Sequence, residues 1–329
     1  MSLTILNNSK VYEKYKIISE IGSGGFAQVY KIQPINDQSN TFYALKYAIT
    51  PKNSDHEVAK RRFAQEIKIY SKVNSDKVAK YIDSYFDENE QYIVMEFVEG
   101  YNLKDKLSEG KLLPKTAQNY AMQIAEGLLE LHASDIIHRD IKSNNIMITN
   151  EKNVKIIDFG LAIDDDSQRY TQESKVVGSV YYMAPEICIS NSQPTKKSDI
   201  YALGILLYEM LTGEYPFKGK DAIDTINKQK NMKLPDLTKI VDIPQAFANV
   251  VIKATAKQAD KRHKSIYEFA QDLKTVYTPR RIYEPALDSK KMKKKLTFQD
   301  FINNKITLWV SLTIIILLII TTILLVVFL

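Results

Sequence analysis

The sequence predicts an α+β fold of two lobes, a small β-rich lobe and a larger α-helical lobe, followed by one C-terminal transmembrane helix. Short strand-like runs with one helical pattern fill the chain up to Gly100, and long apolar-faced helical patterns follow. The last stretch, residues 306–329, contains no charged side chain. An apolar run of this length, with no polar face, is typical of a membrane-spanning helix.

Five strands and one helix are predicted before Gly100. Runs rich in β-branched and aromatic residues, bounded by turn residues, predict strands at 15–20, 28–33, 41–48, 80–86 and 91–98. From Glu57 to Val73 apolar residues recur among charges, which indicates an amphipathic helix.

Helices dominate after Gly100. Apolar-faced patterns predict long helices at Thr116–Ser134 and Ser198–Leu211. Two short strand-like stretches, Ile146–Ile148 and Val154–Ile157, lie between them. We expect a cleft between the two lobes, and such clefts commonly hold a ligand.

The composition is that of a globular protein with a basic segment near its end. Apolar residues make up 45% of the 329 residues and charged residues 26%, which excludes a disordered chain. The net charge of +6 is modest, but lysines gather before the apolar stretch, at positions 290, 291, 293, 294, 295 and 305. Because this run adjoins a predicted membrane span, we interpret it as a contact with the membrane surface and not with nucleic acid.

Cysteine content and the N-terminus both indicate the cytoplasm. Cys188 is the only cysteine, so no intramolecular disulfide can form, and we expect it to be a small buried hydrophobic residue rather than a nucleophile. The first fifteen residues lack a basic region followed by an apolar one, so we expect no secretory signal.

The glycine-rich segment Ile21–Val29 has two readings. Glycines there let backbone N–H groups approach phosphate oxygens. The pattern G-x-G-x-x-A also matches a dinucleotide-binding turn, but that turn requires a helix directly after the glycines. A strand-like run follows here, which favours the other reading.

Charged residues in the following elements fit a phosphate site. Lys46 lies on a predicted strand, and Glu66 on the amphipathic helix could hold its ammonium in place. Taken singly, each of these residues could equally be an ordinary surface charge.

The segment His138–Asn145 carries the strongest chemical signal. Asp140 can accept a hydroxyl proton and orient that oxygen for attack, and Lys142 can neutralise charge on a transferred phosphoryl group. Asn145, and Asp158 in the later Asp-Phe-Gly motif, supply hard oxygen ligands for Mg²⁺.

Together these motifs resemble the eukaryotic-type Ser/Thr protein kinase family, most closely its bacterial membrane-anchored branch, over about Tyr12 to Tyr277. The resemblance implies the bilobal protein kinase fold, with ATP and Mg²⁺, or Mn²⁺, as cofactors. It implies that Asp140 is the catalytic base, that Lys142, Lys46 and Glu66 assist catalysis, and that Asn145 and Asp158 bind the metal. The residues that it places around ATP are Ile21, Gly22, Gly24, Val29, Ala44, Lys46, Met95, Glu96, Val98, Asn145 and Asp158.

The resemblance also implies a scaffold. Glu186 of the Ala-Pro-Glu motif pairs with Arg262, Asp199 braces the catalytic loop, and His138 supports that loop. Two residues depart from the family pattern: Ala27 stands for the third glycine, and His263 follows Arg262 where proline is usual. Neither departure removes a catalytic group.

Lys142 and Ser179 favour Ser/Thr over Tyr as the acceptor, because by resemblance the Ser179 hydroxyl contacts both Asp140 and Lys142. Arg139 beside the catalytic aspartate can pair with a phosphate. We therefore expect self-activation by phosphorylation of the activation segment, and Thr171, Ser174 and Ser179 are the candidate sites.

The apolar tail is long enough to span a bilayer. As a helix, residues 306–329 would measure about 36 Å, against about 30 Å of hydrocarbon. Trp309 lies near one interface, and the lysines before it place the catalytic domain in the cytoplasm. A cleaved lipid-anchor signal is the main alternative, but it requires an N-terminal signal peptide.

The expected organisation has four parts: an N-terminal extension 1–11, a catalytic domain 12–278 with lobes 12–100 and 101–278, a polar, flexible basic linker 279–305, and the span 306–329. The expected partners are protein substrates with Ser or Thr, the membrane and, as the resemblance allows, a second copy of the chain, but no nucleic acid. Alternatives are an inactive kinase-like scaffold, a small-molecule phosphotransferase and a purely structural membrane protein. The complete motif set disfavours the first and third, and the segment 178–186 disfavours the second.

Overall fold

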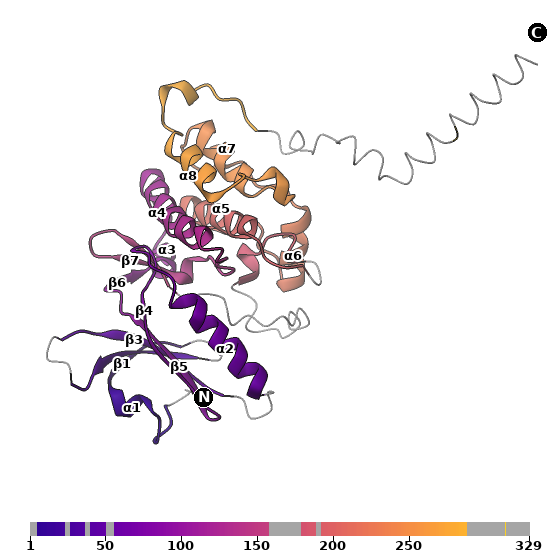
Figure 1. Cartoon of the computed structure of the whole chain (residues 1–329). Helices are drawn as coiled ribbons and strands as arrows, with labels where there is room; N and C mark the ends of the chain where they lie inside the picture. The colour runs from indigo at the N-terminus through magenta and orange to yellow at the C-terminus, as the bar shows by residue number, and fades with distance from the viewer. Residues whose placement is uncertain are drawn as a thin grey trace, which may run out of the picture. The chain divides into compact units, whose positions relative to one another are not determined.

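A computed structural model describes residues 5–23, 27–36, 40–50, 56–157, 179–188, 192–287 and 313. The chain divides into two compact units, Met1–Ser289 and Lys290–Leu329. Within the first unit a β-rich lobe precedes a helical lobe, as the sequence predicts (Figure 1).

The first lobe is built on a five-stranded antiparallel sheet in the order β1-β2-β3-β5-β4. Its strands are β1 (Tyr15–Ser23), β2 (Gln28–Pro34), β3 (Tyr43–Ile49), β4 (Tyr81–Phe86) and β5 (Glu90–Glu96). All five predicted strands are confirmed, and the predicted helix is α2 (His56–Tyr70). Phe63 and Tyr70 fix α2 beside β4, because their rings pack on those of Phe86 and Tyr81 at centroid distances of 5.4 and 5.8 Å.

Residues 5–14 pack on this lobe. Ile5, together with Val11 of the short helix α1 (Val11–Lys14), is buried in one cluster with tyrosines of the sheet. The backbone N–H of Leu6 donates to the Tyr47 hydroxyl (3.2 Å), and that of Lys10 donates to Glu90 Oε1 (2.7 Å). The expected boundary at residue 11 therefore falls inside a packed region.

The second lobe is organised around α5 (Lys196–Thr212), which is buried continuously from Ser198 to Leu211. The other helices of the described part of this lobe are α3 (Leu103–Ser108), α4 (Pro114–Ala133), α6 (Ala222–Asn231), α7 (Gln245–Ala254) and α8 (Ile266–Lys274). Helices α4 and α7 pack on α5, and a Cβ added at Gly204 would lie 2.8 Å from Ala254 Cβ. Glycine therefore permits the close approach of α5 and α7.

A small antiparallel sheet, β6-β7-β8, lies where the lobes meet. It contains β6 (Gly100–Asn102), β7 (Ile146–Thr149) and β8 (Val154–Ile156). Ile156 joins it to the first lobe, because its carbonyl accepts from Ala79 N–H (2.9 Å) and its N–H donates to Lys77 O (2.7 Å). Gly100 has φ 155°, and a Cβ there would lie 2.0 Å from Ile148 O, so only glycine fits at this crossing.

Residues 275–287, after α8, remain packed on the helical lobe. Pro279–Arg281 forms a short 3-10 helix, and the backbone N–H of Leu287 donates to Asn249 Oδ1 of α7 (2.8 Å). Residues 279–287 thus differ from the flexible linker expected from residue 279.

In the part of the chain that the structure describes, no helix is long and apolar enough to cross a membrane. The predicted span 306–329 lies outside that part except for Thr313, so it stays a prediction.

Candidate active site

Asp199, at the start of α5, holds the loop between α4 and β7 through hydrogen bonds. Its Oδ2 accepts the backbone N–H of His138 (2.9 Å) and Nε2 of His132 (2.8 Å), and its Oδ1 accepts the N–H of Arg139 (2.9 Å). Arg139 has φ 71°, a left-handed conformation that costs about 1–3 kcal/mol for a residue other than glycine. The buried carboxylate offsets that cost with hydrogen bonds, which confirms the predicted bracing role of Asp199.

His138 supports the loop from inside, as predicted. It is fully buried, and its Nδ1 accepts the backbone N–H of Asp140 at 3.3 Å. A buried ring in this position orients the next residues of the loop and is remote from solvent.

Asp140 lies at the centre of a compact polar cluster. Its Oδ2 accepts from Lys142 Nζ (2.6 Å) and from Asn145 Nδ2 (2.9 Å), and its backbone carbonyl accepts from Asn145 Nδ2 (2.8 Å). Burial alone would raise the pKa of Asp140, but Lys142, with smaller help from His138 and Asn145, lowers it below its usual value. The carboxylate is therefore ionised at neutral pH and fixed in direction.

Asn145 presents an oxygen to the same place. Its amide NH₂ is used in both bonds to Asp140, so its Oδ1 is the atom that can act as a ligand. The backbone N–H of Ile157 donates to Asn145 O (2.9 Å), which brings the residue before Asp158 to this point. Asp158 itself lies outside the described residues, and its metal role stays a prediction.

The sheet places the predicted nucleotide residues on adjoining strands. Lys46 on β3 is paired in register with Val29 on β2 and Ile93 on β5, and Ala44 is paired with Met95. Val29, Ala44, Lys46 and Met95 are thus brought together by two neighbouring strand pairs.

The roles predicted for five further residues stay predictions. Ile21 and Gly22 lie at the end of β1, where Gly22 pairs with Val29, while Gly24 lies outside the described residues. The backbone of Glu66 lies in α2, but its side chain is outside the description, so its pairing with Lys46 stays a prediction. The same holds for the Ser179 hydroxyl.

The connection between the lobes begins at the end of β5. The Glu96 carboxylate accepts from Lys155 Nζ of β8 (2.8 Å) and from the backbone N–H of Lys80 (3.1 Å). This ion pair joins the two lobes, and the sequence reading missed it because Lys155 belongs to no motif. Val98 follows as a buried residue between β5 and β6.

Glu186 and Arg262 form the predicted ion pair. Arg262 Nη1 and Nη2 donate to Glu186 Oε1 (2.7 Å) and Oε2 (2.6 Å), and Arg262 also donates to the carbonyls of Lys197 and Ala256. Burial would raise the pKa of Glu186, but Arg262 lowers it. The pair fixes residues 179–188 on the helical lobe.

A buried network beside the catalytic loop was not predicted. The Tyr182 hydroxyl donates to Glu209 of α5 and lies 2.9 Å from Ser143 Oγ, and Lys104 Nζ lies 3.4 Å from Glu209 Oε1. Burial, and then Glu209, raise the pKa of Tyr182 well above its usual value, so it stays protonated. The available signal was Glu209 itself, a carboxylate inside an otherwise apolar helix.

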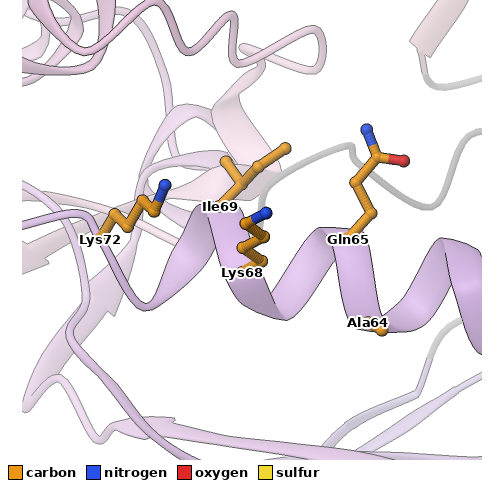
Figure 2. A pocket seen from close by; sticks show the side chains of 5 residues that line it. All are labelled: Ala64, Gln65, Lys68, Ile69 and Lys72. Carbon is orange, nitrogen blue, oxygen red and sulfur yellow. The ribbon is translucent and has the colours of Figure 1, made fainter.

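A surface pocket of about 470 Å³ lies along α2 (Figure 2). Its described lining residues are Ala64, Gln65, Lys68, Ile69 and Lys72. None of the described residues predicted to contact ATP is among them. The two lysines give it a positive charge, and it is separate from the cluster around Asp140.

Cys188 is half-buried rather than fully buried. Its Sγ donates to Ala184 O at 3.5 Å, and burial raises the pKa of the thiol to about 11. The thiol is therefore protonated at neutral pH, which agrees with the expectation that it is no nucleophile.

Comparison with known proteins identifies the family. Residues 15–297 match the protein kinase domain. The chain is 35% identical to serine/threonine-protein kinase PrkC of Bacillus subtilis, over 85% of this chain and 43% of that protein. It is also 35% identical to the probable serine/threonine-protein kinase PknB of Lactococcus lactis, over 80% and 42%. The chain thus spans less than half the length of these relatives.

A more distant relative is serine/threonine-protein kinase PknL of Mycobacterium tuberculosis, 28% identical over 82% of this chain and 67% of that protein. Both the motif set built around Asp140 and the match over most of the chain lead to one conclusion: the chain belongs to the protein kinase family, in its bacterial Ser/Thr branch.

Proposed function

We propose that this chain is a Ser/Thr protein kinase that transfers the γ-phosphoryl group of ATP to Ser or Thr hydroxyls of proteins. The observation that carries the proposal is the cluster in which Lys142 and Asn145 both donate to one oxygen of Asp140, on a loop fixed by Asp199. A carboxylate so oriented can position a hydroxyl for in-line attack.

Asp140 acts mainly by orientation. Its lowered pKa makes it a weak base, so it hydrogen-bonds the acceptor hydroxyl and takes the proton only as the new O–P bond forms. Lys142 lies on the same oxygen and can neutralise charge that develops on the transferred group. No covalent enzyme intermediate is required.

The donor set fits a magnesium ion. Asn145 Oδ1 is a neutral hard oxygen, and the NH₂ group of the same amide is already bonded to Asp140. Asp158 follows Ile157, whose backbone N–H donates to Asn145 O. When bound, Mg²⁺ would offset phosphate charge. Asn145 and Asp158 would hold it.

The nucleotide would bind between the sheet and the connection after β5. Val29, which pairs with Gly22, and Ala44 would supply apolar surface, Lys46 would supply a cation, and Met95 lies in the adjoining strand. The backbone at Glu96–Val98 would pair with the adenine.

Membrane attachment and self-activation complete the proposal. The apolar stretch 306–329 would anchor the chain with the catalytic domain in the cytoplasm, and the basic residues before it would contact the lipid surface. The exposed Arg139 would receive a phosphate on Thr171, Ser174 or Ser179. Protein substrates, and a second copy of the chain in the membrane, are the proposed partners.

The test is transfer of labelled phosphate from ATP by the full chain with Mg²⁺. We expect labelling of Ser and Thr in the chain and in a Ser/Thr-containing protein, mapped by mass spectrometry. Asp140→Ala and Lys46→Ala should both abolish it while ATP binding persists at least in Asp140→Ala. Bound ATP with no transfer by the unmodified chain would point to an inactive scaffold and refute the proposal.

A further inference from the structure

The segment after α8 exposes two adjacent large apolar side chains. Ile282 is 59% exposed, and Tyr283 is 94% exposed, the highest value among the large hydrophobic residues of the described surface. Isolated apolar side chains are ordinary on a protein surface, but neighbouring ones are characteristic of contact sites. Exposed Arg280 precedes them, and we call these three residues the C-terminal corner.

Hydrogen bonds on both sides hold the corner in place. Arg281 Nη1 donates to Asp272 Oδ1 of α8 (2.7 Å), and its Nε donates to Glu284 Oε2 (2.6 Å). Asn249 of α7 then donates to Glu284 Oε1 (2.8 Å) and accepts from Leu287 N–H (2.8 Å). The exposure of Ile282 and Tyr283 is therefore a built feature of the lobe and not the fraying of a chain end.

The charge around the corner is positive. Asp272 and Glu284, which lie beside it, are both paired with Arg281, and this pairing lowers the pKa of Glu284. Arg280 is exposed on this segment, and Lys274 at the end of α8 is exposed as well. The corner thus presents apolar and cationic groups together, which suits the headgroup region of an anionic bilayer.

The position of the corner in the chain also favours contact with a bilayer. The lysine run at 290–295 begins seven residues after Tyr283, and the apolar stretch begins at Ile306. Residues 288–305 could extend about 60 Å, so the anchor alone would leave the catalytic lobe far from the surface and free to turn. Tyrosine and arginine are side chains that favour the membrane–water interface.

We propose that the C-terminal corner is a membrane-contact surface that inserts Ile282 and Tyr283 among anionic lipid headgroups and orients the catalytic lobe on the bilayer. This inference rests on the proposed membrane anchor. It adds a second attachment point on the folded lobe itself, beside α7 and α8.

Spin labelling of the full chain tests the proposal. In a Cys188→Ser background, Tyr283→Cys carries the label, and Tyr267→Cys on α8, 57% exposed, is the matched control. Each chain is placed in nanodiscs that hold one copy, made of phosphatidylcholine with or without phosphatidylglycerol. Accessibility of the label to oxygen is compared with accessibility to a water-soluble nickel chelate.

In anionic nanodiscs we expect the label at 283 to be at least threefold more accessible to oxygen relative to the chelate than the label at 267. Removing phosphatidylglycerol, or adding Arg280→Glu, should reduce that contrast. Equal chelate accessibility at both positions, in a chain that stays with the lipid, would overturn the corner proposal and leave the anchor intact. A chain that does not stay with the lipid would overturn both.

Discussion

Removing the charge of Glu186 should destabilise the helical lobe far more than removing the charge of an exposed glutamate. In Glu186→Gln the carboxylate that faces Arg262 becomes a neutral amide of almost equal size. Arg262 has a side chain that is 0% exposed, whereas that of Glu186 is 22% exposed. The variant therefore leaves a guanidinium buried without its counter-ion.

The expected magnitude follows from that burial. Breaking a buried ion pair by removing one partner costs about 3–5 kcal/mol. We expect the low end, about 3 kcal/mol, because Glu186 is partly solvated and Arg262 keeps its bonds to the carbonyls of Lys197 and Ala256. Adding Arg262→Met removes the unpaired charge, so the double variant should be less destabilised than the sum of the single ones.

The matched control is Glu109→Gln. Lys106 and Glu109 are also 2.6 Å apart, but their side chains are 42% and 66% exposed. Exposed pairs contribute little to stability because solvent screens them, so this variant should unfold almost like the parent. Urea unfolding followed by circular dichroism, at equal protein concentration, measures both free energies.

The stabilisation by the Glu186–Arg262 pair depends on pH. Because the pKa of Glu186 is lowered in the folded state, its contribution is fully present above about pH 4.5 and is lost as pH falls through the folded pKa. The gap between parent and Glu186→Gln should therefore be constant near neutral pH and close in acid. A loss below 1 kcal/mol at pH 7, or one equal to that of Glu109→Gln, would refute the reasoning.

Two other substitutions have defined outcomes. Asp199→Asn removes the charge that holds the N–H groups of His138 and Arg139, so phosphate transfer should fall about 100-fold while circular dichroism is unchanged; full activity would contradict the bracing role. Lys257→Met should stabilise the protein by roughly 2 kcal/mol at pH 6.5 and by less at pH 9, measured by urea unfolding. Burial lowers the pKa of Lys257 to about 7 from 10.5, so between these values the unfolded chain binds more protons and stability rises with pH. The nearby face of Phe217 attracts the cation and limits the effect, and an equal gain at both pH values would exclude this explanation.

The clustering of Asp140, Lys142 and Asn145 could be predicted from the sequence because these residues are close along the chain. Asp140, Lys142 and Asn145 lie within six positions of one loop, so their spacing alone brings them together. The strands except β6, and the helices α2, α4 and α5, were predicted from the period of apolar residues, which reports the buried face of an element, whereas α3, α6, α7 and α8 were not predicted. The sequence predicted α5 only as an apolar-faced helix, whereas the structure buries every residue from Ser198 to Leu211, including Asp199 and Glu209.

Contacts between segments far apart in the chain could not be predicted in this way. Periodicity shows that a face is buried but does not name what covers it, so the docking of Ile5 and Val11 on the sheet could not be predicted. The same applies to residues 279–287, whose polar composition suggested a linker until Arg281 and Asn249 provided partners.

The sequence by itself predicted the candidate catalytic groups and the order of the two lobes. Tertiary structure alone decided how those groups are held: Asp199 meets His138 across 61 positions, and Glu186 meets Arg262 across 76. The physical reason is that a buried charge is tolerated only where a group of opposite charge, or a hydrogen-bond partner, packs against it. Which residue becomes that partner depends on how whole helices stack around α5, and no local sequence pattern encodes this.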